Sequence, residues 1–563
     1  MSYLWFILAL VVVLGLLWRF LGAYMVAVYD GTTHWLGFVE RPVYKLLRVD
    51  AEAEQSWQRY GMSLIVYSGV AILVVYLMLR LQGSLPLDPQ HLGAVSPALS
   101  FNTAVSFVTN TNWQNYAGET TMSYLSQMGA LAVQNFASAS VGIGVAVALI
   151  RGFSRKGSAT IGNFWVDLVR GILYILLPIS LLATIVFMAQ GGVQTFAGPV
   201  HVHDVLNGVR QTIPRGPVAS QEAIKQLGTN GGGFFNANGA HPYENPTGLT
   251  NFLSIVLLLA IPVALTHTFG KMVGNVRQGV AVLAVMALIF GAWLGIASYA
   301  EHVGNPAVAA AGVTHQGAGN MEGKEVRFGV QQSTIYNVAS TQTSTGSVDS
   351  ANDSYTPMGG FAMLSGMMFG DVTPGGVGSG LYTILLFAII TVFIGGLMVG
   401  RTPEYLGKKI QAREVKLAAF AVLVMPMTVL VMTGIAVSIH AGRVAPLNAG
   451  PHGFSEILYA FTSQGNNNGS AFAGLSSNTA FYNVSGAITM LLGRFAIIVP
   501  VLALAGSLAA KQHVAASAGT FRTDTPLYAG LLVGVVLIVG ALTFFPAVAL
   551  GPIAEQLSTG RLF

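Results

Sequence analysis

The stretch Gly228-Thr229-Asn230-Gly231-Gly232-Gly233 separates two long apolar runs, residues 171–188 and 249–270, neither of which contains Asp, Glu, Lys or Arg. A helix needs roughly 20 apolar residues to cross the hydrocarbon core of a bilayer, and both runs approach or exceed that length. Similar runs occur on both sides of this stretch, so we expect about ten transmembrane spans. The others lie at 3–18, 62–79, 129–150, 278–300, 376–400, 417–439, 480–510 (interrupted only by Arg494) and 527–550.

The composition indicates the same fold class. Of the 563 residues, 53% are hydrophobic and 9% are charged, whereas about 25% of the residues in an average soluble domain are charged. We therefore predict an all-α polytopic membrane protein. The chain has no Cys, which excludes disulfides, thiolate nucleophiles and thiolate metal sites.

The basic residues predict an orientation. No small-residue cleavage site follows the first apolar run, so we expect it to be retained as an anchor. If the N-terminus lies outside, the inner loops hold 16 of the 27 Lys and Arg residues in about a sixth of the chain, as the positive-inside rule requires. Both termini should then lie outside. These inner loops are 29–60, 151–163, 269–277, 401–416 and 511–526.

Four outer loops carry a tract rich in Gly, Asn, Thr and Ser, each between two spans and each preceded by a segment too short to cross the membrane. The first such segment starts with Ser96-Pro97, a favourable helix start. We predict four repeated membrane-pore-membrane units around one axis, with one extra span at each end. The expected boundaries are 1–28 (extra helix), 60–150, 164–270, 278–400 (with a broken second helix) and 416–510 (four repeats), and 525–550 (C-terminal helix).

The residue types in the tracts favour a cation filter. Irregular backbone is tolerated at membrane depth where it is buried in protein or lines a watery path. Gly allows positive φ, so that successive carbonyl oxygens can replace the hydration shell of an ion. The tracts contain no Asp or Glu, which favours potassium over magnesium, although spacing alone does not separate potassium from sodium. Any single tract could be an ordinary turn, but four in register favour a filter.

Longer motifs around these tracts resemble the KdpA family, the potassium-binding subunits of bacterial potassium-transporting ATPases. The motifs are Thr229–Asn238 with His241-Pro242 and Glu244–Thr247, Asn466–Gly474, and Thr109–Gln114. The resemblance extends from the first span to the last. It implies that Gln114 contributes to selectivity beside a potassium-binding filter. By position, the filter residues would be Asn110, Thr111 and Asn112; Thr229, Asn230 and Gly231; Ser344, Thr345 and Gly346; and Asn467, Asn468 and Gly469.

Two further features are expected to act below the filter. Arg494 interrupts an otherwise uncharged span, and a charge at membrane depth usually faces a cavity and serves transport; the alternative is an Arg that snorkels to the inner surface. Residues 358–380 are rich in Gly and contain Pro374, so we expect a broken helix. By resemblance this segment is a gate loop. Asp371 within it would help to steer the ion, or would cap a helix.

The resemblance also implies partners. The family subunit does not hydrolyse ATP, and this chain lacks a G-x-x-x-x-G-K-[ST] phosphate loop and an Asp-Lys-Thr-Gly phosphorylation motif. A P-type ATPase subunit (KdpB-like), accessory KdpC-like and small KdpF-like subunits, and membrane lipids would be its partners in the bacterial inner membrane, with no organic cofactor and no nucleic acid. A stand-alone four-repeat potassium channel or symporter is the alternative function.

Overall fold

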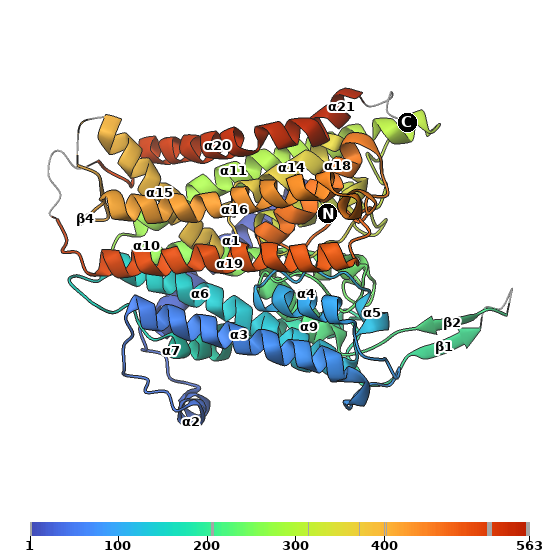
Figure 1. Ribbon diagram of the computed structural model, residues 1–563, viewed down its shortest axis with the longest axis horizontal. Helices are drawn as coiled ribbons and strands as arrows, with labels where there is room; N and C mark the ends of the chain where they lie inside the picture. The colour runs from blue at the N-terminus through green and yellow to red at the C-terminus, as the bar shows by residue number, and fades with distance from the viewer. Residues whose placement is uncertain are drawn as a thin grey trace.

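The computed structural model describes residues 3–203, 208–313, 315–370, 372–398, 400, 402–514 and 521–558. Its helices lie side by side along one long axis (Figure 1), and among these residues ten are long and apolar enough to cross a membrane. The predicted fold class and the expected number of spans are confirmed. The spans contain α1 (Tyr3–Tyr29), α3 (Trp57–Leu81), α6 (Val133–Ser154), α7 and α8 (Phe164–Arg170 and Leu177–Ala189, joined by a π-helical turn), α10 (Gly248–Met272), α11 (Val276–Val303), α15 (Ser379–Met398), α16 (Ala412–Ser438), α19 (Ala480–Ala509) and α20 (Pro526–Val548).

The spans differ in how deeply they are buried. In the span Ser126–Ser154, which contains α6, 89% of the apolar window is buried, against 17% in Tyr3–Tyr29. The sequence of α6 explains this position, because small Gly, Ala and Ser residues alternate with Val and Ile along it and let neighbouring backbones approach closely. The helix α6 therefore lies at the centre of the bundle, and α1 lies at its edge.

Four short helices do not span the bundle, and each is followed directly by one of the four tracts. These are α4 (Pro97–Val108), α9 (Val218–Leu227), α13 (Gly329–Gln342) and α18 (Gly450–Gly465). Pro lies in the first turn of α4 and α18, where its missing N–H costs nothing. A further helix, α14 (Pro357–Met368), is separated from α15 by residues 369–378.

The remaining elements are short and lie at the two ends of the bundle. Two antiparallel hairpins pair β1 (Val200–His203) with β2 (Arg210–Ile213) and β3 (Glu404–Tyr405) with β4 (Lys408–Lys409). The first hairpin projects from the end toward which both chain termini point (Figure 1). The short helices are α2 (Gly37–Leu47), α5 (Gly118–Thr121), α12 (Pro306–Ala310), α17 (His440–Arg443) and α21 (Ala554–Ser558).

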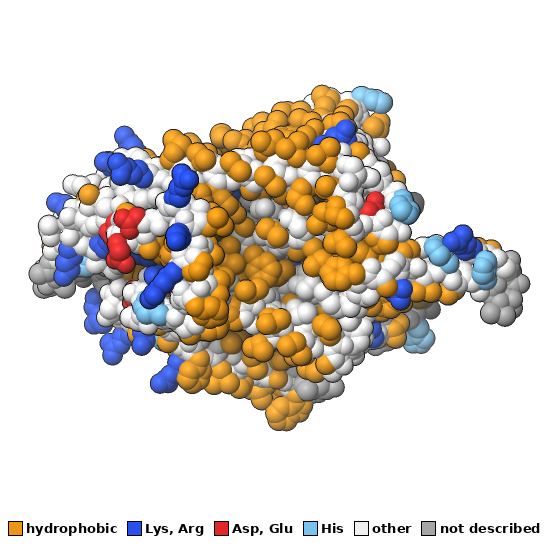
Figure 2. Space-filling model, turned by 90° about the horizontal axis from the view of Figure 1, so that it is seen from below, with side chains coloured by type: hydrophobic (Ala, Val, Ile, Leu, Met, Phe, Trp, Pro, Cys, Tyr) orange, Lys and Arg blue, Asp and Glu red, His pale blue; other side chains and the backbone are white. Residues whose placement is uncertain are grey.

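The surface has the charge distribution of a membrane protein. Figure 2 shows a broad hydrophobic zone along the middle of the molecule, with most of the visible Lys and Arg side chains gathered at the end opposite the β1–β2 hairpin. This end includes the β3–β4 hairpin (Figure 1). The chain is a multi-pass membrane protein with one strongly basic end.

Candidate functional site: a ring of four polar tracts

In each tract the three filter residues begin two residues after the short helix ends, and the first of the three adopts a left-handed backbone. The φ angles are 65° at Asn110, 44° at Thr229, 50° at Ser344 and 53° at Asn467. A left-handed residue after a helix stops its hydrogen-bond ladder, and it is uncommon for residues other than Gly. All four tract openings therefore share the same backbone geometry although they have three different side chains.

The third residue of each tract is also left-handed, whereas the middle residue is not. The φ angles are 54° at Asn112, 79° at Gly231, 79° at Gly346 and 100° at Gly469. Such alternation turns successive peptide planes, so that consecutive carbonyl oxygens can face the same side. Three of the four positions are Gly, the residue for which positive φ costs least.

The Gly residues also bring neighbouring tracts into close contact. A Cβ added to Gly231 would lie 1.8 Å from the Thr345 carbonyl oxygen, and one added to Gly346 would lie 2.1 Å from that of Asn468. A Cβ on Gly469 would lie 2.0 Å from the carbonyl oxygen of Thr111. The contacts run from the second tract to the third, the fourth and back to the first, so the tracts form a ring in chain order.

Side-chain hydrogen bonds hold the ring together. The Asn110 amide donates to the Thr229 carbonyl oxygen at 2.9 Å, and the Asn230 amide donates to the side-chain oxygen of Asn110 at 2.6 Å. On the other side, the Ser344 hydroxyl donates to the Asn466 carbonyl oxygen at 2.8 Å, and the Asn467 amide donates to Thr111 Oγ1 at 2.9 Å. These side-chain bonds join the first tract to the second, the third to the fourth and the fourth to the first.

The first tract has Asn112 where the others have Gly, and the structure accommodates its side chain behind the ring. Asn112 Nδ2 donates to Asn135 Oδ1 on α6 at 2.7 Å. Gln114 clamps the first tract to the second, because its Nε2 donates to the Gly233 carbonyl oxygen and its Oε1 accepts from the Gly233 N–H, both at 3.0 Å. Gln114 thus lies beside the ring and positions its neighbour.

A buried ion cluster lies behind the second tract. Lys225 Nζ lies 2.5 Å from both Glu222 Oε2 and Glu244 Oε2, and it donates to Asn238 Oδ1 at 3.0 Å. All three charged side chains are almost fully buried. The sequence does not predict this burial, because Glu222 and Lys225 are three residues apart on a helix and such a pair can equally lie on a solvated face.

The loop after the third tract carries a buried carboxyl group. Asp349 accepts a hydrogen bond from the Ser350 hydroxyl at 3.2 Å, and its N–H donates to Asn337 Oδ1. Burial raises the pKa of Asp349 to about 7, although hydrogen bonds from Ser350 and Asn251 oppose the shift. A large fraction of this carboxyl is therefore protonated at neutral pH.

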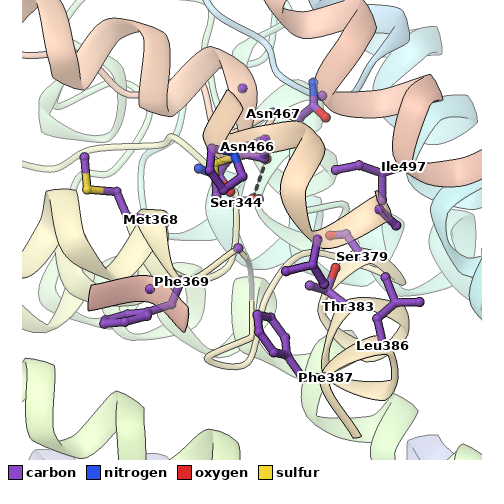
Figure 3. Close-up of a pocket in the computed structure, with 18 of the residues that line it drawn as sticks. Ser344, Met368, Phe369, Ser379, Thr383, Leu386, Phe387, Asn466, Asn467 and Ile497 are labelled. Carbon is purple, nitrogen blue, oxygen red and sulfur yellow. Dashed lines mark hydrogen bonds between the residues drawn. The ribbon is translucent and has the colours of Figure 1, made fainter. Parts of the chain in front are cut away.

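A small cavity of about 50 Å³ lies against one side of the ring (Figure 3). Asn110, Ser344 and Asn467 form one end of it, and Arg494 also lines it. The Arg494 guanidinium donates to the Ser138 carbonyl oxygen on α6 at 3.1 Å and is buried. This positive side chain therefore faces the cavity below the tracts and does not reach the surface.

The break between α14 and α15 passes directly beside the ring. The Val377 N–H donates to Thr229 Oγ1 at 2.9 Å, and the Gly375 N–H donates to the carbonyl oxygen of Gln342, the last residue of α13, at 2.9 Å. A Cβ on Gly378 would lie 2.0 Å from the Gly142 carbonyl oxygen on α6.

Asp371 lies outside the described residues. Sequence reasoning missed the α6 contacts, because nothing distinguishes Asn135 or Gly142 from other small or polar residues of a span.

Comparison with known families matches nearly the whole chain. The family model described as KdpA, potassium-transporting ATPase A subunit, matches residues 7–557. A relative from Mesorhizobium japonicum is 54% identical over 97% of this chain and 96% of its own length, and one from Herminiimonas arsenicoxydans is 53% identical over 98% of both. Both are named potassium-transporting ATPase potassium-binding subunit.

A solved structure shares the fold at low sequence identity. The potassium transporter TrkH from Vibrio parahaemolyticus superposes with a TM-score of 0.52 at 14% identity, and the match covers 87% of this chain and 96% of that one. This likeness concerns the arrangement of helices.

Proposed function

Because the chain belongs to the KdpA family of potassium-transporting ATPase A subunits, we infer that it is the potassium-binding, non-hydrolytic subunit of an ATP-driven potassium uptake pump. The observation that carries this inference is the ring of four tracts with repeated left-handed geometry and no charged residue within it. Neutral oxygens suit a monovalent cation, which must shed its water to enter such a ring. The pump takes potassium from the outer face and delivers it to its ATPase subunit.

We propose that the tracts form one selectivity filter, contributed by four repeats with the boundaries predicted from the sequence. The close contacts at Gly231, Gly346 and Gly469 support this, since they fix the spacing between neighbouring backbones. Gln114 keeps the first and second tracts in register and thereby sharpens selectivity. The potassium-binding residues are Asn110, Thr111, Asn112, Thr229, Asn230, Gly231, Ser344, Thr345, Gly346, Asn467, Asn468 and Gly469.

Arg494 and the 369–378 segment form the barrier below the filter in this proposal. A guanidinium that lines the cavity repels a second cation, which hinders leakage toward the inner side. The segment contacts the filter through Val377 and Gly375, so its movement would alter the ion's exit. The part proposed for Asp371 in steering the ion rests on the sequence alone.

The cavity suggests how the ion leaves the filter. Besides the tracts, it is lined by residues of α15, α16 and α20, including Phe387, Met425 and Val539, and the first of these side chains is visible in Figure 3. With Arg494 opposing direct inward movement, a sideways path between helices toward the ATPase subunit is favoured. An inter-subunit tunnel of this kind would start at the cavity.

Family membership and the charge distribution support a proposal for the complex and for its orientation. We propose a KdpB-like P-type ATPase subunit, KdpC-like and KdpF-like accessory subunits and lipids as partners in the bacterial inner membrane. The basic end of the molecule (Figure 2) would lie in the cytoplasm. Both termini would then be periplasmic.

Uptake of potassium at micromolar concentration tests the proposal in cells that lack their own uptake systems. The chain is expressed alone or with its ATPase subunits, as wild type or as Gly231→Asp. We expect uptake only with the partners, its loss on ATP depletion, and weaker potassium selectivity in Gly231→Asp because the new carboxylate enters the ring. Equal uptake without partners would instead indicate a stand-alone channel or symporter.

A further inference from the structure

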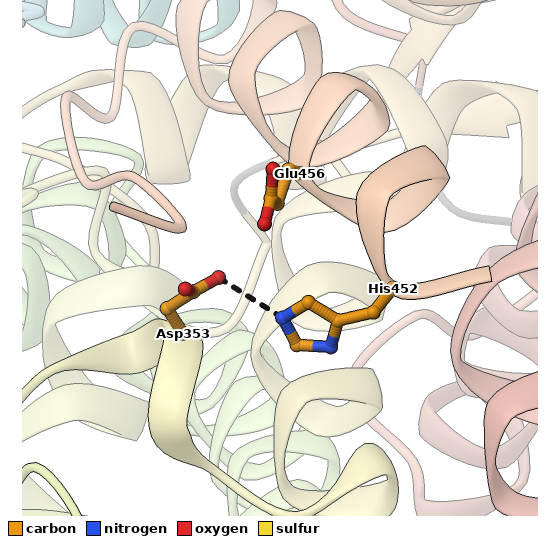
Figure 4. Close-up of side chains that lie close together, drawn as sticks. All are labelled: Asp353, His452 and Glu456. Carbon is orange, nitrogen blue, oxygen red and sulfur yellow. Dashed lines mark hydrogen bonds and ion pairs between the residues drawn. The ribbon is translucent and has the colours of Figure 1, made fainter. Parts of the chain in front are cut away.

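Three side chains that could bind a metal converge at the end of the molecule where the chain termini lie, away from the tracts themselves. One ligand atom each from Asp353, His452 and Glu456 lies within 4.8 Å of the other two. Figure 4 shows the three side chains facing one another. His452 and Glu456 are four residues apart on α18 and so share one helix face, whereas Asp353 comes from the loop after the third tract. The cluster therefore joins two repeats.

Glu456 is the unusual member of this cluster. Its side chain is fully buried, and Oε1 accepts a hydrogen bond from Asn448 Nδ2 at 2.6 Å. Oε2 is also buried, and among the residues that the structure describes it has no hydrogen-bond donor. A buried carboxylate oxygen without a donor is costly. Figure 4 shows one carboxylate oxygen of Glu456 pointing toward the space between Asp353 and His452, so a cation in this space would lie against a carboxylate that the protein leaves partly unsatisfied.

His452 is held in the orientation that a metal ligand needs. Nδ1 lies 2.8 Å from Glu555 Oε1 on α21, and Nε2 lies 3.2 Å from Asp353 Oδ1. A carboxylate that accepts from one imidazole nitrogen fixes the ring and leaves the other nitrogen to bind a metal. Glu555 would have this positioning part, and a metal ion would replace the proton between Nε2 and Asp353.

We propose that Asp353, His452 and Glu456 bind a divalent transition-metal cation of the zinc type. One imidazole nitrogen with carboxylate oxygens is a donor set that suits Zn²⁺ better than Ca²⁺ or Mg²⁺, which prefer oxygen ligands alone. A dication also balances the excess of carboxylates at this place. Asp353 and His452 line a cavity of about 160 Å³, and the carboxylates of Glu555 and Glu322 line it as well. This cavity, next to the cluster, has room for a water molecule as a further ligand.

Occupation of the site would stiffen the outer side of the ring. Asn352, next to Asp353, donates to the Tyr459 hydroxyl at 3.0 Å, and that hydroxyl lies 2.8 Å from Ser470 Oγ directly after the fourth tract. A metal that joins Asp353 to α18 therefore restrains the same loop that braces the fourth tract. The proposal does not depend on which ion the tracts bind.

The test is metal binding by the purified full-length chain, and by its complex, after treatment with a chelator. Isothermal titration with ZnCl₂ should show one tight site per chain, which His452→Ala and Glu456→Gln weaken by about 100-fold or more. Glu555→Gln should weaken it by roughly 10- to 100-fold, as expected for loss of a positioning partner. The double variant His201→Ala/His203→Ala is the matched control, since these histidines lie on the exposed side of the β1–β2 hairpin, and it should bind zinc like wild type.

A second measurement does not depend on the folding of any variant. Co²⁺ added to the wild-type chain should give the visible absorption of a tetrahedral nitrogen and oxygen site, and one equivalent of Zn²⁺ should remove it. MgCl₂ and CaCl₂ at the same concentration should not. The absence of a stoichiometric zinc site, or equal zinc binding by wild type and His452→Ala, would overturn the proposal and leave the cluster as a network of ion pairs.

Discussion

The second and third tracts have the same backbone but are supported in opposite ways. Thr229–Gly231 and Ser344–Gly346 both alternate left-handed residues with a residue that is not left-handed. Behind the second tract lies the buried cluster in which Lys225 pairs with Glu222 and Glu244. Behind the third lie hydroxyl groups and one carboxyl: the Tyr336 hydroxyl lies 2.6 Å from Ser347 Oγ, and the carboxyl of Asp349 is partly protonated at neutral pH. The ring thus demands one backbone geometry and tolerates different chemistry behind it.

The largest effect on potassium binding is expected where the two tracts are alike. Gly231→Ala and Gly346→Ala should each reduce potassium affinity by about 100-fold or more, equivalent to about 2.7 kcal/mol. In each case the new Cβ would overlap a carbonyl oxygen of the next tract, and φ is positive. Potassium-dependent uptake by the assembled pump measures the loss.

Gly295→Ala on α11 is the control for both variants, because a Cβ at Gly295 meets nothing within 4 Å. It should transport like wild type. If only one of Gly231→Ala and Gly346→Ala loses potassium affinity, the two tracts do not both require Gly at this position. The claim that they need the same backbone geometry would then be wrong.

The next prediction concerns protein stability and the ion cluster that only the second of these two tracts has behind it. Lys225→Met should destabilise the protein by roughly 3 to 5 kcal/mol, because it leaves two buried carboxylates without their cation. The double variant Lys225→Met/Glu244→Gln should recover part of this loss. Thermal unfolding in detergent provides the measurement, with the exposed Lys156→Met as control. Equal unfolding temperatures for Lys225→Met and Lys156→Met would mean that the cluster contributes nothing to stability.

The spans and the positions of the tracts could be predicted from the sequence, but the contacts behind the tracts could not, for a physical reason. Apolar length predicts spans, and the Gly and Asn of the tracts predict where helices stop, since both depend on local composition. The contacts of Asn112 with Asn135 and of Val377 with Thr229 join residues far apart in the chain. No local pattern encodes such pairs. The burial of Lys225 was likewise unpredictable, because an i,i+3 pair with Glu222 is equally common on a solvated helix face.

The third prediction concerns the charge state behind the third tract. An unfolded Asp loses its proton near pH 4, whereas the pKa of buried Asp349 is about 7. Between these values the folded protein holds the extra proton, so stability should fall as pH rises from about 4 to 7 and then stay level. Asp349→Asn should remove this dependence and be more stable at pH 8 by roughly 3 to 4 kcal/mol.

Unfolding temperatures of wild type and Asp349→Asn at pH 5, 6, 7 and 8 provide the test. The variant should be more stable by roughly 1 to 2 kcal/mol at pH 5, and the difference should grow as pH rises to 7, because the unfolded Asp is already ionised above pH 4. A constant difference across the range would show that Asp349 is already ionised at pH 5. The third tract would then be backed by charge like the second, and the contrast between them would disappear.

The smallest effect is expected for the hydroxyl groups that lie behind the third and fourth tracts. It tests whether these hydroxyl groups contribute equally to potassium binding in both tracts. Both place a Tyr on the short helix in contact with a Ser directly after the tract, Tyr336 with Ser347 and Tyr459 with Ser470. Ser347→Ala should cost only about 1 kcal/mol, or roughly five-fold in potassium affinity, because Gln226 Nε2 still donates to the Tyr336 hydroxyl at 2.6 Å. Ser470→Ala should cost at least as much, since Asn468 Oδ1, which lies 2.5 Å from Ser470 Oγ, would lose this donor inside the ring. If both variants bind potassium like wild type, hydroxyl groups behind the filter only fill space, and the geometry of the third and fourth tracts is held by their Gly contacts alone.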